Sequence, residues 1–193
     1  MAKFIVEHME EELFDWCKLE YAHMAEFIPK DSLIFTNLES LPSINAITHK
    51  EKISQLMHLF PKEDICLLDS ESDQILQPED AAKFKYFLLG GILGNVDEWD
   101  EDRTKELRKE GYATRNLGRV QMTTDTALLT AHMIVERGEK FEDLEFVDRP
   151  EIEVEKGKEK IVLEFRFLKK NDGSAEMAKG IAALLLKENT FFE

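Results

Sequence analysis

Short apolar runs alternate with longer stretches of helical periodicity over the first two thirds of the chain, and this alternation restricts the fold most strongly. Apolar residues occupy successive positions within the runs, which indicates strands buried on both faces of a sheet. Strands that alternate with helices at this spacing are typical of βαβ units and of a mainly parallel sheet. The sequence therefore predicts an α/β fold with a sheet flanked by helices. Strands are expected at 3–7, 32–36, 65–69, 85–89 and 113–117, and helices at 13–28, 47–60, 77–83, 103–110 and 124–136.

The last fifth of the chain has a different pattern. Apolar and polar residues alternate from Ile152 and again from Ile161 to Leu168, with a turn signal at 156–158 between them, which predicts a hairpin. A closing helix is expected at 175–187. The chain has 193 residues, the length of one domain. We therefore expect an α/β domain over 1–150, with the hairpin and helix of 151–193 packed on it.

The chain carries a net charge of −15, from 25 Lys and Arg against 40 Asp and Glu. The negative electrostatic potential of such a protein repels phosphate backbones and attracts cationic partners within about 8–10 Å at physiological salt. A protein that binds nucleic acid normally presents a basic face. The charge therefore favours a basic protein over RNA as the partner, although acidity alone is also typical of ordinary soluble proteins.

Cys17 and Cys66 lie in apolar surroundings without a CxxC motif or a Cys/His cluster, which indicates buried thiols in a reducing compartment. The histidines show no ligand spacing, so we expect no metal site. The N-terminus has no apolar region of signal-peptide length, and no apolar run approaches the roughly 20 residues that a bilayer requires. The expectation is a soluble cytoplasmic protein with no membrane partner.

Glycine is unevenly distributed along the chain. The first 89 residues contain none, and five of the nine glycines fall between Gly90 and Gly118. Glycine is used where the backbone turns with positive φ or approaches a ligand closely. We expect Gly90, Gly91 and Gly94 to turn sharply after a strand, at the edge where open α/β sheets bind ligands. Their spacing fits neither GxGxxG nor a phosphate loop, and a tight turn packed on a helix would explain it equally well.

A second loop follows the fifth predicted strand and leads into an apolar helix. Thr123, Thr124 and Asp125 suit a helix N-terminus, but capping does not explain Gly118, Gln121 and Met122 just before them. Together the two loops could form a cleft of backbone donors with an apolar floor. Such a cleft suits an adenine ring and a thioether or sulfonium.

The motifs of these loops resemble those of a small SPOUT-class methyltransferase family. The resemblance rests on Gly90-Gly91-Ile92-Leu93-Gly94 followed by Gln121-Met122-Thr123-Thr124-Asp125-Thr126-Ala127, and it covers roughly residues 3–150. The characterised eukaryotic member of that family is a protein arginine methyltransferase acting on a small-subunit ribosomal protein. The C-terminal hairpin and helix show no such resemblance.

The resemblance implies a SPOUT fold with a C-terminal trefoil knot at about 85–136, an exception to unknotted topology. It also implies that S-adenosylmethionine is the cofactor and that arginine in a basic, small-subunit ribosomal protein is the substrate. SPOUT enzymes commonly dimerise through the knot, whereas this family is expected to be monomeric. RNA methylation and a non-catalytic docking module stay open as alternatives. The cofactor-binding residues implied are Leu89, Gly90, Gly91, Gly94, Leu117, Gly118, Gln121, Met122 and Thr123.

Arginine methylation needs carboxylates, because a guanidinium has a pKa above about 12 and no free lone pair. A carboxylate can align the guanidinium by bidentate pairing and later accept a proton. We expect Glu7, Asp69 and Asp125 in this catalytic role, because each lies at the end of a strand or in a cofactor loop. Taken alone, each is equally typical of a solvated or capping carboxylate.

A run of acids follows the first glycine loop. Asp97, Glu98 and Trp99 are the expected substrate-binding residues of this run, and His8 is expected to face the same cleft. The acids would attract an arginine-bearing peptide, and Trp99 could stack on a guanidinium. The alternative is a solvated loop.

Overall fold

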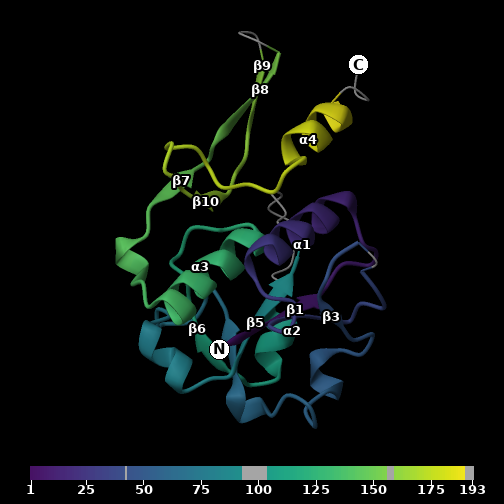
Figure 1. The fold of residues 1–193 in the computed structure, drawn as a ribbon, viewed down its shortest axis with the longest axis vertical. Coiled ribbons are helices and arrows are strands. Elements are labelled where there is room, and N and C mark those ends of the chain that lie inside the picture. Colours follow the sequence, from purple (N-terminus) through teal and green to yellow (C-terminus); the bar gives the residue numbers. More distant parts are fainter. Residues whose placement is uncertain (42, 93–103, 156–158, 190–193) are drawn as a thin grey trace.

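The computed structural model describes residues 1–41, 43–92, 104–155 and 159–189 of the chain (Figure 1). The centre of the described part is a six-stranded sheet in the order β3-β2-β1-β5-β4-β6, in which every neighbouring pair is parallel. The predicted α/β class and mainly parallel sheet are confirmed. The strands are β1 (Lys3–His8), β2 (Leu33–Thr36), β3 (Ile47–Thr48), β4 (Ile65–Leu68), β5 (Tyr86–Gly91) and β6 (Ala113–Arg115).

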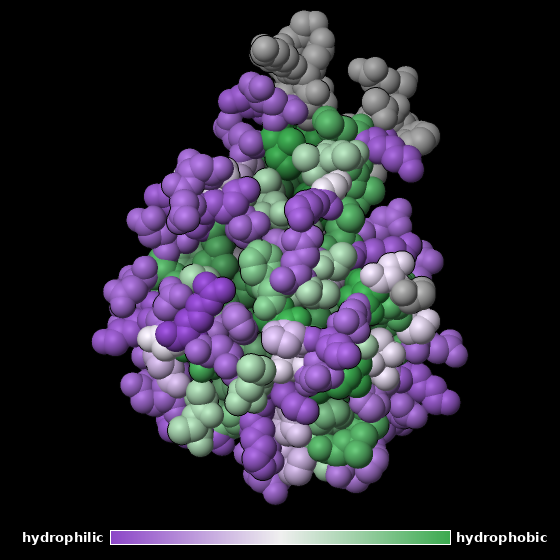
Figure 2. All heavy atoms as spheres, in the orientation of Figure 1, coloured by the Kyte–Doolittle hydropathy of each residue, from purple (hydrophilic) through white to green (hydrophobic). Residues whose placement is uncertain are grey.

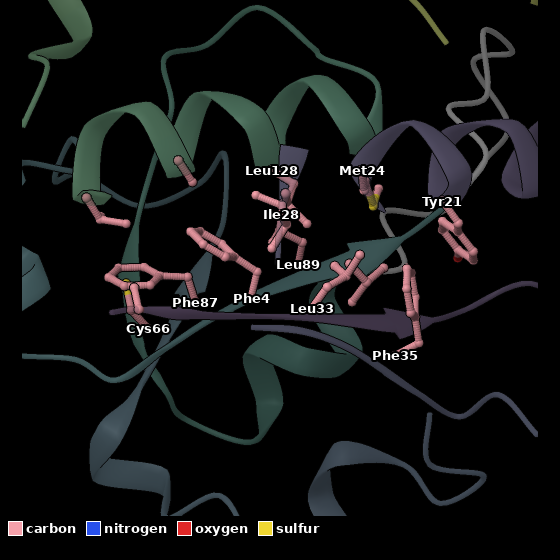
Figure 3. Close-up of a cluster of buried hydrophobic side chains, with 14 of the residues drawn as sticks. Phe4, Tyr21, Met24, Ile28, Leu33, Phe35, Cys66, Phe87, Leu89 and Leu128 are labelled. Atoms are coloured by element: carbon pink, nitrogen blue, oxygen red, sulfur yellow. The ribbon is translucent and has the colours of Figure 1, made fainter. Parts of the chain in front are cut away.

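Two apolar clusters cover the two faces of this sheet. One cluster joins the sheet to α1 (Asp15–Phe27) and α3 (Thr124–Arg137), and Figure 3 shows Tyr21 and Met24 of α1 projecting toward Leu33 and Phe35 of β2. The other cluster includes Leu107 of α2 (Thr104–Lys109) and the short 3-10 turn η1 (Ile53–Gln55). Because successive residues of a strand point to opposite faces, the uninterrupted apolar runs supply both clusters.

The prediction of a helix at 47–60 is wrong, because this segment contains a short strand and a 3-10 turn. Ile47 and Thr48 form β3 beside β2, and the segment then passes through η1 and turns. Ile53, Leu56 and Phe60 have the spacing of a helix face and are all buried. Strand pairing by Ile47 and Thr48 outweighs the local periodicity, as tertiary context commonly does.

Three further 3-10 turns connect these elements. They are η2 (Lys62–Asp64), η3 (Pro78–Ala82) and η4 (Phe141–Asp143). The short helix predicted at 77–83 is the 3-10 turn η3, which Pro78 opens.

The C-terminal segment forms two small antiparallel sheets and a helix. β8 (Glu151–Glu155) pairs with β9 (Glu159–Val162) as the predicted hairpin, whereas β10 (Arg166–Leu168) pairs with β7 (Phe146–Asp148). The closing helix α4 spans Ile181–Asn189 and begins later than predicted, because Gly180 has φ +99° and Glu176 is bonded to the end of β10. Figure 1 shows the hairpin and α4 projecting from the same end of the molecule.

Side chains of the C-terminal segment pack on the body of the protein. Phe165 and Phe167 are buried in a cluster against which Trp16 of α1 packs. Lys179 lies 3.0 Å from the Glu26 carboxylate of α1. Figure 2 shows hydrophobic residues at this end and also through the middle and lower right of the visible face, with hydrophilic residues between them. The division into 1–150 and 151–193 stays a prediction.

Candidate functional site

The carboxyl ends of β1, β5 and β4 meet at one edge of the sheet. Glu7 of β1 lies level with Gly90 of β5, and the Leu67–Leu88 register of β4 places Asp69 level with the same glycine on its other side. Neighbouring strands are about 4.8 Å apart, so the backbones of Glu7 and Asp69 are about 10 Å apart. Glu7 and Asp69 also share the face of Ile5 and Leu67, which is the face covered by α2. The edge thus brings two carboxylates together around a residue without a side chain.

Gly90 and Gly91 do not form the predicted turn, because β5 continues through both residues. A Cβ at Gly90 would lie 3.0 Å from Met9 Sδ, and a Cβ at Gly91 would overlap the Tyr21 hydroxyl oxygen. Close packing of the β1–α1 connection and of α1 on β5 therefore explains these two glycines. The backbone N–H of Met9 donates to the Gly91 carbonyl at 3.1 Å and ties this connection to the strand end.

The second loop is held by a buried asparagine. Asn116 donates from Nδ2 to the Ser72 carbonyl at 2.8 Å and accepts from the Gly118 N–H at 2.9 Å. Gly118 has φ +85°, which explains a glycine there. On the far side, the Arg166 N–H of β10 donates to the Gln121 carbonyl at 2.8 Å. The loop is thus fixed from the sheet and from the C-terminal segment.

Glu7 is a buried carboxyl group with defined donors. Its Oε2 accepts from the Thr36 hydroxyl and from the Ile53 N–H, the latter at 3.0 Å. Burial raises the pKa of Glu7, and these hydrogen bonds and the charge of Lys52 oppose that rise. A carboxyl group whose pKa is raised is suited to accepting a proton near neutral pH.

Asp69 is already paired with a guanidinium. Arg108 of α2 donates to both carboxylate oxygens, at 2.6 and 2.7 Å. Burial of Asp69 acts to raise its pKa, but the Arg108 pair and the Glu71 N–H outweigh it, so the pKa lies below its ordinary value. Bidentate pairing of this kind is how carboxylates bind guanidinium groups, and here Arg108 of the same chain is the guanidinium that Asp69 binds.

Asp125 lies away from Glu7 and Asp69, in the first turn of α3 on the other face of the sheet. Its Oδ2 is 2.6 Å from His23 Nδ1 of α1, and its Oδ1 accepts from the Thr126 N–H at 2.8 Å. The Asp125 side chain is 2% exposed. It therefore holds two elements together rather than facing the other two carboxylates.

His8 ends β1 on the α1 side of the sheet. Its Nδ1 lies 2.8 Å from the Tyr21 hydroxyl, and its buried Nε2 has no hydrogen-bond partner among the described residues. Burial lowers the pKa of His8, so the ring is neutral near pH 7. The predicted residues Gly94, Asp97, Glu98 and Trp99 lie outside the described residues.

The side chains of the two loops fit an S-adenosyl ligand. Leu89, Leu117 and Thr123 are buried, and Met122 is half-buried against the same apolar cluster. Neutral apolar, thioether and hydroxyl groups suit an adenine ring and a sulfonium better than a phosphate. Within the described ranges, no group of three or more His, Cys, Asp or Glu residues could hold a metal ion. No helix in that part of the chain is long and apolar enough to span a membrane.

Sequence reasoning missed the residues that position this edge. Tyr21, Asn116 and the pair Glu20–His23 occupy ordinary places in helix or loop patterns. The polar side chains at Glu20 and His23 interrupt the buried stripe of α1, and that interruption was the available signal.

Comparisons with known proteins agree with this arrangement. A family model described as "Protein arginine N-methyltransferase SFM1-like" matches residues 3–190, so the resemblance extends through the C-terminal segment and not only to about residue 150. Protein arginine N-methyltransferase SFM1 of Saccharomyces cerevisiae is 37% identical over 97% of this chain and 95% of its own length.

Solved structures lead to the same group of proteins. The yeast SFM1 complex with SAM has a TM-score of 0.88 at 33% identity, covering 98% of this chain and 92% of that one. The SAH complex has a TM-score of 0.86 at 33% identity, covering 95% and 94%. Trm10 of Thermococcus kodakaraensis, with a TM-score of 0.58 at 15% identity over 74% of this chain and 96% of that one, shares the fold alone. The predicted SPOUT-type fold is confirmed, and the chain belongs to the SFM1-like family of protein arginine N-methyltransferases.

Proposed function

We propose that this protein transfers a methyl group from S-adenosylmethionine to an arginine side chain of a basic protein. The observation that carries the proposal is the pair of buried carboxyl groups, Glu7 and Asp69, on either side of Gly90 at the loop edge. The family supports the same chemistry, because yeast SFM1 is named an arginine methyltransferase and crystallised with SAM and SAH.

When bound, S-adenosylmethionine would supply an electrophilic methyl group on its sulfonium. Leu89, Leu117 and Met122 would enclose its apolar parts, and the backbone of Gly118 and Gln121 would approach it closely. Since Asn116 and Arg166 fix this loop, the protein contributes mainly orientation of the reacting atoms.

We assign the proton-accepting role to Glu7. Its carboxyl group is held by the Thr36 hydroxyl and the Ile53 N–H, and its raised pKa makes it a better base than an exposed glutamate. It would align one terminal nitrogen of the substrate arginine and accept the proton as the bond to the methyl forms. Asp69, through its Arg108 pair, would shape the other side of the guanidinium site.

We also propose a substrate, an oligomeric state and a chain topology. The substrate would be a small-subunit ribosomal protein, the enzyme would act as a cytoplasmic monomer, and residues 85–136 would form the trefoil knot. A net charge of −15 supports a cationic protein as the partner.

Labelled S-adenosylmethionine tests the transfer directly in a cell lysate. Label in the product should be lost on protease digestion, whereas loss on ribonuclease digestion would identify RNA as the substrate and overturn the proposal. No transfer with intact cofactor binding would indicate a docking module.

Substitution of the carboxyl groups tests the residue assignment. Glu7→Gln should lower transfer at least about tenfold, about 1.4 kcal/mol of barrier, with little change in binding of S-adenosylhomocysteine. Asp69→Asn should lower it as well. If neither variant changes transfer, the carboxylate assignment is wrong.

A further inference from the structure

A group of four titratable side chains, three of them buried, lies beside the proposed cofactor site. Glu20 and His23 come from α1, Asp125 from the first turn of α3, and Glu176 from the C-terminal segment before α4. His23 Nδ1 lies 2.6 Å from Asp125 Oδ2, and His23 Nε2 lies 3.4 Å from Glu176 Oε1. Glu20, His23 and Asp125 are at most 4% exposed.

The surroundings raise the pKa values of both Glu20 and His23. Burial and the neighbouring Asp125 charge raise the pKa of Glu20 well above its ordinary value, which favours its neutral form. Burial also acts to lower the pKa of His23, but Asp125 and Glu176 outweigh it, so this pKa is raised. The nearby Lys179 is paired with Glu26. Both ring nitrogens of His23 lie against carboxyl oxygens, the arrangement in which a doubly protonated imidazole ring can donate from each nitrogen.

The position of this group relates it to the cofactor loops. Asp125 directly follows Thr123 and Thr124 at the end of the second loop, and the Thr124 hydroxyl lies 3.4 Å from the Ile92 carbonyl of the first loop. Glu20 also faces the Thr124 backbone. Any movement of the start of α3 would therefore move residues where the two loops meet.

We propose that His23 is a positioning residue, which through its contacts with Asp125 and Glu176 clamps the start of α3 to the C-terminal segment and so completes the cofactor site. This inference rests on the proposed cofactor site and assigns the C-terminal segment a part in forming it. His23 does not touch the reacting atoms; it acts through Asp125 and Thr124.

The proposal predicts a pH dependence of cofactor binding with a definite sign. Because the pKa of His23 is raised, the clamp is complete at low pH and is lost as pH rises through that pKa. Affinity for S-adenosylhomocysteine should therefore fall on going from about pH 6 to about pH 9. If His23 only filled space in the core, its protonation would not change the affinity for S-adenosylhomocysteine between these pH values.

Calorimetric titration of the full chain with S-adenosylhomocysteine provides the test. His23→Gln should bind roughly tenfold more weakly at low pH, a coupling within the usual range, and should lose the pH dependence. The matched control is His132→Gln, since His132 lies further along α3 and contacts the Phe4 ring. This control should keep both affinity and pH profile.

A second variant covers the case in which His23→Gln does not fold. The Glu176 side chain is 27% exposed, and Glu176→Gln removes one of the two charges that raise the pKa of His23. The pH at which binding weakens should then shift downward. An unchanged midpoint in Glu176→Gln, or a wild-type profile in His23→Gln, would overturn the inference. Wild-type protein that binds the ligand but methylates nothing would instead contradict the proposed function.

Discussion

Gly91 shows how one residue sets the distance between a helix and the edge of the sheet. The Tyr21 hydroxyl occupies the space of the missing Cβ and lies 2.8 Å from His8 Nδ1. The sequence analysis predicted a structural need for glycine at Gly90 and Gly91, but it placed both residues in a turn and not in β5. It could not reveal their partners, because Tyr21 is 70 residues earlier and only the fold brings it to β5.

We expect Gly91→Ala to destabilise the protein by about 1–3 kcal/mol through overpacking. Much of that loss should be recovered in a Tyr21→Phe background, because the overlapping hydroxyl is absent there. Urea unfolding of the two single variants and the double variant measures the coupling. Additive effects would show that the Tyr21 hydroxyl is not what requires glycine.

Glu7→Gln tests the raised pKa of Glu7 at the level of stability. Because the folded-state pKa is raised by burial, ionised Glu7 lowers the stability of the fold above that pKa. The glutamine variant should therefore be at least as stable as wild type near neutral pH, with an advantage that shrinks as pH falls through the pKa of Glu7. Unfolding free energies at several pH values check this, with exposed Glu39→Gln as the control.

At the scale of elements, strongly apolar segments were predictable and connections were not. The strands β1, β2, β4 and β5 could be predicted from the local sequence alone. Strands buried on both faces are nearly continuous apolar runs, so they can be identified without knowing which strand pairs with them. The helix prediction for 47–60 failed because β3 pairs with β2 and because the Ile53 N–H donates a hydrogen bond to Glu7. Both interactions are non-local, so local periodicity could not predict them.

The second loop depends on Asn116. Asn116→Ala would leave the Ser72 carbonyl and the Gly118 N–H without their partner, at a cost of about 1–3 kcal/mol. We expect weaker binding of S-adenosylhomocysteine together with lower stability. Asn171→Ala, in an exposed turn, is the control and should change neither. Unchanged affinity in Asn116→Ala would show that this loop does not hold the ligand.

For the molecule as a whole, the sequence predicted the sheet, the second loop and the hairpin, but not the contacts of the C-terminal segment with the rest of the protein. β10 bonds to Gln121, and Glu176 reaches His23. These contacts join residues far apart in sequence. Nothing in the alternating pattern of 151–168 distinguishes a projecting hairpin from a strand that supports a loop.

A chain ending at residue 150 should therefore lose S-adenosylhomocysteine binding and unfold at least about 10 °C lower. It lacks the buried Leu163, Phe165 and Phe167 and leaves their partners exposed. The control replaces only 151–162 by a short turn, since the Leu163 N–H lies 3.0 Å from the Pro150 carbonyl. That variant should bind within about threefold of wild type, a difference under 1 kcal/mol. Full affinity in the shorter chain would contradict a structural role for the segment.

We expect methyl transfer to arginine to take place at the edge formed by Glu7 and Asp69. Purified protein should be incubated with S-adenosylmethionine and a basic peptide containing one arginine, beside the same peptide with lysine in its place. Mass spectrometry should find a methyl group on the arginine peptide only, and much less with Glu7→Gln. Equal methylation of the lysine peptide would rule out arginine as the specific acceptor, and undiminished transfer by Glu7→Gln would rule out Glu7 as the proton acceptor.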